Sequence, residues 1–188
     1  LNAKQHGEYV IDLNDGEEYA FIRDHQMDGI CLFPATGYLV LVWKTFAKLH
    51  HYEDFRQLAV LFENVQISAT GCKVGYKTVF HITILPNDGS FEIVNNNNVI
   101  VTGRISISER LMMQELHQKQ SHDDDGSDDV TQILQSDEIY RHLSLRGYEY
   151  SGLFRSIQRM NVNVNSGVLI WRDDWISYLD GMLQVHVL

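Results

Sequence analysis

The densest apolar stretch of the chain covers residues 35–50 and reads ATGYLVLVWKTFAKLH. Leu41, Val42 and Trp43 are consecutive, so the apolar positions are not confined to one helical face. A helix that is apolar on all sides is covered by other structure. Pro34 precedes the stretch, and proline is tolerated in the first turn of a helix. We therefore predict a buried helix over residues 35–50 that begins at Pro34.

Segments rich in β-branched and aromatic residues follow this predicted helix, and such residues favour strands. They cover residues 58–68, 77–85, 91–95 and 99–108. The turn-forming clusters PNDGS and NNN separate the last three segments. This order predicts an antiparallel meander curled around the helix. Two shorter extended pieces are predicted before the helix, at residues 8–13 and 19–23.

The apolar patterns typical of helices and strands are lost over residues 111–130, where the run HDDDGSDD is acidic and has no periodicity. Such composition favours a solvated, flexible linker. A calcium-binding loop is the alternative interpretation. However, Ser121 stands where the first aspartate of that motif belongs, and Gln132 stands where its final glutamate belongs. We therefore predict a linker.

Ordered patterns return after this linker. Residues 136–160 are predicted to be helical with a break marked by glycine, and residues 167–171, GVLIW, are predicted to form a strand. Residues 173–188 predict a second apolar helix, which Asp173 or Asp174 can cap.

Composition narrows the classes of function. The chain has 188 residues, is 44% hydrophobic and carries a formal net charge of −10, which argues against broad binding to nucleic acid or to acidic membranes. It has no apolar run long enough to span a bilayer, no signal peptide and no initiator Met. We expect part of a longer cytoplasmic protein in which Cys31 and Cys72 are free thiols; a single disulfide is the alternative.

Two polar residues interrupt the second apolar helix, Asp180 and Gln184, and their four-residue spacing puts them on one face. A buried carboxylate costs free energy unless it is hydrogen-bonded, so Gln184 either simply satisfies Asp180 or shares a function with it. His25 precedes the first helix, where a histidine is more often a cap or a surface residue. Together, a histidine that titrates near neutrality and a carboxyl kept protonated by burial could form an acid–base pair. The motifs GxSxG, CxxC and HExxH and a phosphate loop are absent from the sequence, and no metal site is predicted, so the pair suits an elimination.

Three segments resemble motifs of one family. HQMDGICLFP fits the HxxxGxxxxP motif of dehydratase domains in type I fatty acid and polyketide synthases, and LDGMLQ fits their DxxxQ motif. LRGYEYSGLF is similar to their LRGYxYGPxF segment. The order and spacing of the three segments resemble animal fatty acid synthase over nearly the whole chain.

The resemblance implies an α+β protein with a double hot-dog fold, in which an antiparallel sheet wraps a helix twice. The N-terminal hot-dog would cover residues 1–110, and the acidic linker would cover residues 111–130. Residues 131–188 would begin the C-terminal hot-dog and include its central helix, so that this second hot-dog is incomplete in the chain.

The implied activity is that of a lyase, which dehydrates a 3-hydroxyacyl thioester on acyl carrier protein to the trans-2-enoyl thioester. This reaction belongs to fatty acid or polyketide chain elongation. It needs no cofactor beyond the phosphopantetheine that carries the substrate. The expected partners are acyl carrier protein and the other domains of a homodimeric type I multienzyme, with no nucleic acid and no membrane.

Within that reaction, His25 would remove the proton next to the thioester carbonyl. Asp180 would protonate the departing hydroxyl, and Gln184 would orient Asp180. The N–H groups of Ala35 and Thr36 at the helix start would stabilise the negative charge that builds on the carbonyl oxygen.

Three further residues complete the predicted substrate-binding set. Gly29 permits a tight loop that brings the histidine inward, and Pro34 begins the helix. Tyr150 lies in the third motif, where Ser151 and Gly152 replace the usual Gly-Pro. We expect this replacement to loosen the turn and to leave Tyr150 less firmly placed.

Two other classes of function stay open. One is a different hot-dog activity on thioesters, either hydrolysis or product-template cyclisation. The other is a non-catalytic hot-dog scaffold that retains the motifs, although the presence of all three predicted catalytic residues argues against it.

Overall fold

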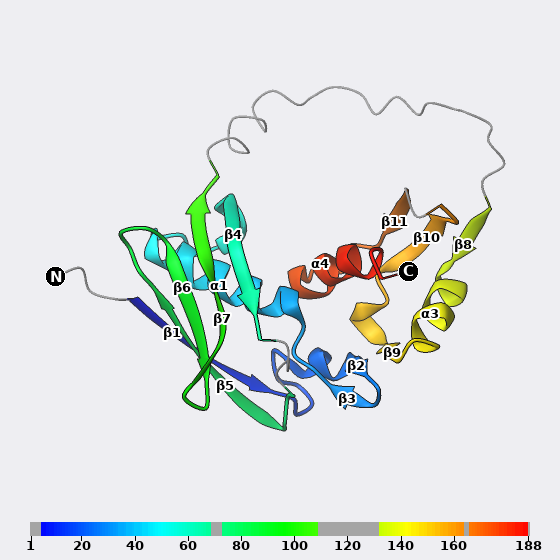
Figure 1. Cartoon of the computed structure of the whole chain (residues 1–188), viewed down its shortest axis with the longest axis horizontal. Coiled ribbons are helices and arrows are strands. Elements are labelled where there is room, and N and C mark those ends of the chain that lie inside the picture. The colour runs from blue at the N-terminus through cyan, green and yellow to red at the C-terminus, as the bar shows by residue number, and fades with distance from the viewer. Residues whose placement is uncertain (1–4, 69–72, 109–131, 164–165, 188) are drawn as a thin grey trace.

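The computed structural model describes residues 5–68, 73–108, 132–163 and 166–187 as a mixture of helices and antiparallel sheets (Figure 1). The N-terminal half contains β1 (Gln5–Asp12), the 3₁₀ helix η1 (Ala20–Asp24), β2 (His25–Met27), β3 (Ile30–Cys31), α1 (Ala35–Leu49), the 3₁₀ helix η2 (Phe55–Gln57), β4 (Val60–Ile67), β5 (Lys77–Ile84), β6 (Ser90–Asn95) and β7 (Asn98–Ile107). The C-terminal half contains β8 (Ile133–Gln135), α3 (Ser136–Ser144), β9 (Tyr148–Tyr150), the 3₁₀ helix η3 (Gly152–Phe154), β10 (Ile157–Asn161), β11 (Gly167–Leu169) and α4 (Trp175–Gln184).

A five-stranded antiparallel sheet, in the order β1-β5-β6-β7-β4, packs against α1 (Figure 1). Alternate residues of β5 face the core, where Phe80, Ile82 and Ile84 are fully buried. Residues 40–42 of α1 are also buried although they are consecutive, so structure covers the helix on several sides. The predicted buried helix and the meander that follows it are confirmed.

Two details before α1 differ from the prediction. Pro34 has the extended backbone of an N-cap residue, with φ −65° and ψ 145°, so it precedes the first turn of the helix. Residues 19–23, predicted to be extended, instead lie largely within η1. There the Ile22 N–H donates to the Tyr19 carbonyl, and such short-range bonds replace pairing with a strand.

The prediction that residues 136–160 are helical is wrong beyond α3. The Gly147 N–H donates to the Ser144 carbonyl, and Gly147 has φ +86°, a conformation that ends the helix. The chain then runs through β9 and η3 into β10, the central strand of a sheet in the order β11-β10-β8. The predicted strand at residues 167–171 is confirmed as β11.

A small three-stranded sheet, in the order β3-β2-β9, joins the two halves of the chain. A tight hairpin connects β2 to β3 through Asp28 and Gly29, which have φ +49° and +72°. His25 begins β2 and pairs with Tyr150 of β9. The histidine, which we expected a tight loop to bring inward, is therefore held in a strand.

The two apolar helices contact each other near their N-termini. The Thr36 hydroxyl of α1 donates to the Ile176 carbonyl of α4 at 3.0 Å. The Asp174 carboxylate accepts from the Ser177 N–H at 2.7 Å and caps α4, as predicted, whereas Asp173 has φ +57° and is not the cap. The helix ends at Gln184, earlier than predicted.

Several predictions fall wholly or partly outside the described residues, including the acidic linker at 111–130 and the state of Cys72. Cys31, within them, is a free thiol. The domain boundaries stay predictions. No helix in the described part of the chain has the length and apolar character needed to cross a membrane.

Close packing of α4 gives the first prediction. A Cβ added at Gly181 would lie 1.9 Å from the buried Ser156 Oγ, so one of the two segments must move. We expect Gly181→Ala to lower the free energy of unfolding by about 1–3 kcal/mol in denaturant titrations. Gly75→Ala is the control, because a Cβ there meets no atom within 4 Å. Equal stability of the two variants would contradict the packing described.

Candidate active site

His25 is buried, and one hydrogen bond determines its tautomer. Nδ1 lies 2.8 Å from the Leu32 carbonyl oxygen, which can only accept. Nδ1 must therefore carry a proton, and in the neutral ring Nε2 is left with a lone pair. Because Nδ1 is bound to the chain that leads into α1, Nε2 is the nitrogen able to accept a proton.

Asp180 faces that free nitrogen from the middle of α4. Its Oδ1 lies 3.7 Å from His25 Nε2, longer than a hydrogen bond. Burial raises the pKa of Asp180 above its usual value, while the His25 charge and the hydrogen bond from Gln184 act in the opposite direction. A raised pKa favours the protonated carboxyl, which is the form that can act as an acid. At this spacing Nε2 and Oδ1 are not hydrogen-bonded to each other.

Gln184 is the residue that holds Asp180, as predicted from their spacing. Its Nε2 donates to Asp180 Oδ2 at 2.8 Å and to the Phe154 carbonyl at 3.0 Å. Its Oε1 accepts from the Tyr140 hydroxyl at 3.0 Å. Every polar atom of this fully buried amide is therefore satisfied.

Aromatic rings pack against the His25 side chain. The centroid of the His25 ring lies 5.4 Å from that of Tyr150 and 5.0 Å from that of Phe154. Burial raises the pKa of Tyr150, and the charge that Asp180 carries when ionised acts in the same direction, so the Tyr150 hydroxyl stays protonated at neutral pH. The rings reduce the hydration of the pair, which strengthens electrostatic interactions inside the site.

Asp24 fixes the turn after Tyr150 through two hydrogen bonds from Ser151. The Ser151 N–H donates to the Asp24 carbonyl at 3.0 Å, and the Ser151 hydroxyl donates to the Asp24 carboxylate at 2.6 Å. Gly152 has φ +48°, and a Cβ there would lie 2.1 Å from Asp24 Oδ2. The looser turn that we expected is therefore not seen, because serine supplies a hydrogen bond to Asp24.

The other predicted substrate-binding residues have structural contacts in this structure. The Gly29 N–H donates to the Glu149 carboxylate at 3.1 Å and so stabilises the β2–β3 hairpin. Pro34 is buried before α1, and the Thr36 hydroxyl donates to the Ile176 carbonyl of α4. The N–H groups of Ala35 and Thr36 belong to the first turn of α1, which leaves such groups without partners inside the helix. Their role towards a substrate stays a prediction.

Sequence reasoning missed three residues of the site. Asp24 anchors the turn after Tyr150, Phe154 packs on His25 and supplies a carbonyl to Gln184, and Tyr140 binds that same glutamine. Phe154 is the last residue of the LRGYEYSGLF segment, so the motif was a signal for it. No signal in the sequence pointed to Tyr140.

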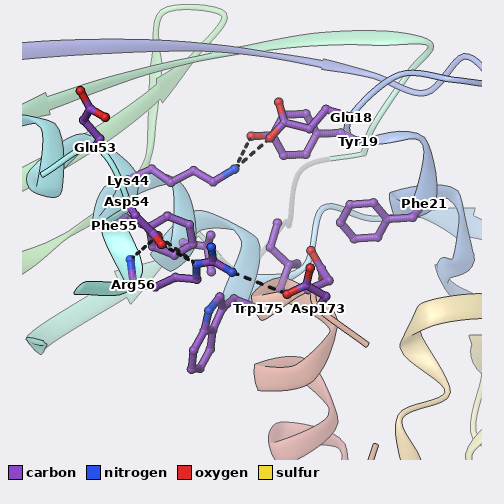
Figure 2. Close-up of a pocket in the computed structure, with 13 residues that line it drawn as sticks. Glu18, Tyr19, Phe21, Lys44, Glu53, Asp54, Phe55, Arg56, Asp173 and Trp175 are labelled. Carbon is purple, nitrogen blue, oxygen red and sulfur yellow. Dashed lines mark hydrogen bonds and ion pairs between the residues drawn. The ribbon is translucent and has the colours of Figure 1, made fainter. Parts of the chain in front are cut away.

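A separate pocket of about 560 Å³ lies between α1, η2 and the N-terminus of α4 (Figure 2). Figure 2 shows Lys44 directed towards Glu18 and Arg56 directed towards Asp54 and Asp173, with ion-pair distances of 2.9, 2.9 and 3.6 Å. His25 and Asp180 do not line this pocket. Among the described residues, no group of three or more His, Cys, Asp or Glu side chains is arranged to hold a metal ion.

Burial of Asp180 has a consequence for stability. Because the pKa of the folded state is raised above the usual 3.8, the folded chain binds this proton more tightly than the unfolded chain. The associated stabilisation is fully present below about pH 4 and is lost as the pH rises through the folded pKa. We expect Asp180→Asn to become increasingly stable relative to the wild type as the pH rises, in denaturant titrations at several pH values.

The exposed Asp15 provides the matched control, since Asp15→Asn makes the same chemical change at an exposed side chain. A constant difference in stability between Asp180→Asn and the wild type at all pH values would show that the pKa of Asp180 is not raised by folding.

No family model matches the chain. The chain is 24% identical over 162 residues to a highly reducing polyketide synthase, aurA, of Calcarisporium arbuscula; the match covers 79% of this chain but only 6% of that protein.

Solved structures share the fold. The dehydratase domain of the CurF module of curacin polyketide synthase is 16% identical with a TM-score of 0.68, and the alignment covers 98% of this chain and 70% of that one. The dehydratase domain of PpsC from Mycobacterium tuberculosis, solved with C12:1-CoA, is 15% identical with a TM-score of 0.69 and coverages of 98% and 68%. These neighbours confirm the predicted fold class, a partial double hot-dog; the expected likeness to animal fatty acid synthase stays a prediction.

Proposed function

We propose that the chain is a dehydratase domain that removes water from a 3-hydroxyacyl thioester during polyketide or fatty acid synthesis. The observation that carries the proposal is the buried pair of His25 Nε2 and Asp180 Oδ1, 3.7 Å apart. The fold of the neighbours supports the same class of reaction. Two structures of the CurK dehydratase, described as inactive mutants, carry a histidine-to-phenylalanine and an aspartate-to-asparagine substitution, which agrees with a reaction that needs one residue of each kind.

In the proposed reaction His25 Nε2 takes a proton from the carbon next to the thioester carbonyl. The electron pair of that C–H bond forms the new carbon–carbon double bond, and the bond to the 3-hydroxyl breaks. Asp180 Oδ1 gives its proton to the departing oxygen, so the products are water and the trans-2-enoyl thioester. Transfer of a proton from His25 to Asp180 then restores both groups.

The substrate would be carried on the phosphopantetheine of acyl carrier protein, and other synthase domains would be the partners. The chain spans about 6% of the length of the curated relative, so these partners and a homodimeric parent are part of the proposal. The PpsC dehydratase was solved with an acyl-CoA, a thioester, which supports this class of substrate. Thioester hydrolysis would need an attacking water, product-template cyclisation would need a different cavity, and a scaffold would show no turnover.

The base is tested with His25→Ala. We expect formation of the enoyl thioester to fall by roughly 10²-fold or more, the usual contribution of a general base. Ultraviolet absorbance of the enoyl product follows the reaction, and circular dichroism checks the fold. His81→Ala is the control, because the His81 side chain is 56% exposed. A His25→Ala variant that dehydrates at the wild-type rate would refute the assignment.

The acid is tested with Asp180→Asn in the same assay. An amide can hydrogen-bond the hydroxyl but is a very poor acid, so we expect turnover to fall by roughly 10²-fold or more with little change in KM. Full activity would show that water, and not Asp180, supplies the proton. Release of free thiol without enoyl product by the wild type would instead favour the hydrolytic alternative.

A further inference from the structure

Tyr140, one of the three site residues that sequence reasoning missed, completes a buried chain of hydrogen bonds that reaches Asp180. Its side chain lies on α3 and is 6% exposed. The hydroxyl oxygen lies 3.0 Å from the Ile157 N, 3.0 Å from Gln184 Oε1 and 3.1 Å from the Phe154 carbonyl oxygen. The chain continues from Gln184 to Asp180 at 2.8 Å. Tyr140 is thus two hydrogen bonds away from the proposed acid.

One assignment of the protons gives every donor and acceptor among these groups a partner. The Ile157 N–H must donate, so the Tyr140 oxygen accepts from it. The Phe154 carbonyl can only accept, and Gln184 Nε2 already donates to it. The Tyr140 hydroxyl therefore donates its proton to Gln184 Oε1, which would otherwise have no donor. Rotating the Gln184 amide by half a turn would place its oxygen against the Phe154 carbonyl and Asp180 Oδ2, two contacts between acceptors.

This orientation decides which oxygen of Asp180 carries the proton. Oδ2 accepts from Gln184, so the proton of the neutral carboxyl lies on Oδ1, which faces His25 Nε2. We propose that Tyr140 is a positioning residue that, through Gln184, keeps the transferable proton of Asp180 on Oδ1. The inference rests on the proposed function, because it concerns the proton that the dehydration would use.

Burial allows Tyr140 to keep this role over a wide pH range. Burial raises the pKa of Tyr140 to about 12, although Ile157, Ser156 and Arg155 act in the opposite direction, so the hydroxyl remains a donor. The Arg155 guanidinium lies 4.8 Å from the centre of the Tyr140 ring and pairs with Asp137. The titratable groups that face Asp180 come from other elements: His25 from β2, Tyr150 from β9 and Tyr140 from α3.

The test is Tyr140→Phe, which keeps the ring and removes the donor. Without that donor, Gln184 Oε1 loses its partner and the amide is less firmly held. Its donation to Asp180 Oδ2, which lowers the pKa of Asp180, then weakens, so that pKa rises. We expect the Asp180 pKa to move upward in a ¹³C NMR titration of labelled aspartate carboxyls, with the Asp180 signal assigned from Asp180→Asn. A variant that merely loosens the core would admit water and move this pKa downward. A downward shift, or none, would overturn the proposal.

Tyr76→Phe makes the same chemical change at an 84% exposed residue and is the control. In the dehydration assay we expect Tyr140→Phe to lower kcat roughly tenfold, the effect of one ordinary hydrogen bond, with KM unchanged. In a Gln184→Ala background, Tyr140→Phe should cause no further loss of kcat, because its effect passes through Gln184. Additive losses would overturn the proposal.

The titration needs no substrate, so it separates this inference from the proposed function. If the wild type lacks dehydratase activity but the pKa of Asp180 still rises in Tyr140→Phe, the proposed function fails while the hydrogen-bond chain stands. If the wild type is active and that pKa does not rise, the inference alone fails.

Discussion

The antiparallel pairing of β2 with β9 is the contact on which the whole site depends. It places His25, from the N-terminal half, directly opposite Tyr150 from the C-terminal half. The hairpin at Asp28 and Gly29 ties the same strands together through the Glu149 carboxylate and the Gly147 carbonyl. Since Asp180 reaches the histidine from a helix far along the chain, neither half could form the pair alone.

The buried surroundings then make His25 suited to accept a proton and Asp180 suited to donate one. The Leu32 carbonyl leaves His25 with a free Nε2, while burial raises the pKa of Asp180 and so favours its protonated form. The cost of placing a carboxyl in the interior is offset by the hydrogen bond from Gln184, which other buried groups orient in turn. In the pocket between α1 and α4, by contrast, each of the two cationic side chains pairs with a carboxylate. Lys44 pairs with Glu18, and Arg56 pairs with Asp54.

Hydrophobic periodicity and residue composition predicted the elements whose structure is determined by neighbouring residues in the sequence. The apolar run of α1 and the β-branched strands β5, β6 and β7 were recognised because period and composition agree there. The segment after α3 was mistaken for helix, because the turn at Gly147 and the pairing of β9 with β2 depend on tertiary contacts. For the site, the spacing of Asp180 and Gln184 predicted their hydrogen bond. Tyr140 was missed because its partners, Ile157 and Gln184, are distant in sequence.

The fate of one proton tests the central claim most directly. A 3-hydroxyacyl thioester on acyl carrier protein, fully deuterated at the carbon next to the carbonyl, would be incubated with the protein and its products analysed by mass spectrometry. The account predicts a trans-2-enoyl thioester that has lost the 3-hydroxyl group and one deuterium atom and retains the other deuterium atom. Free 3-hydroxy acid that retains both, or unchanged substrate, would contradict it.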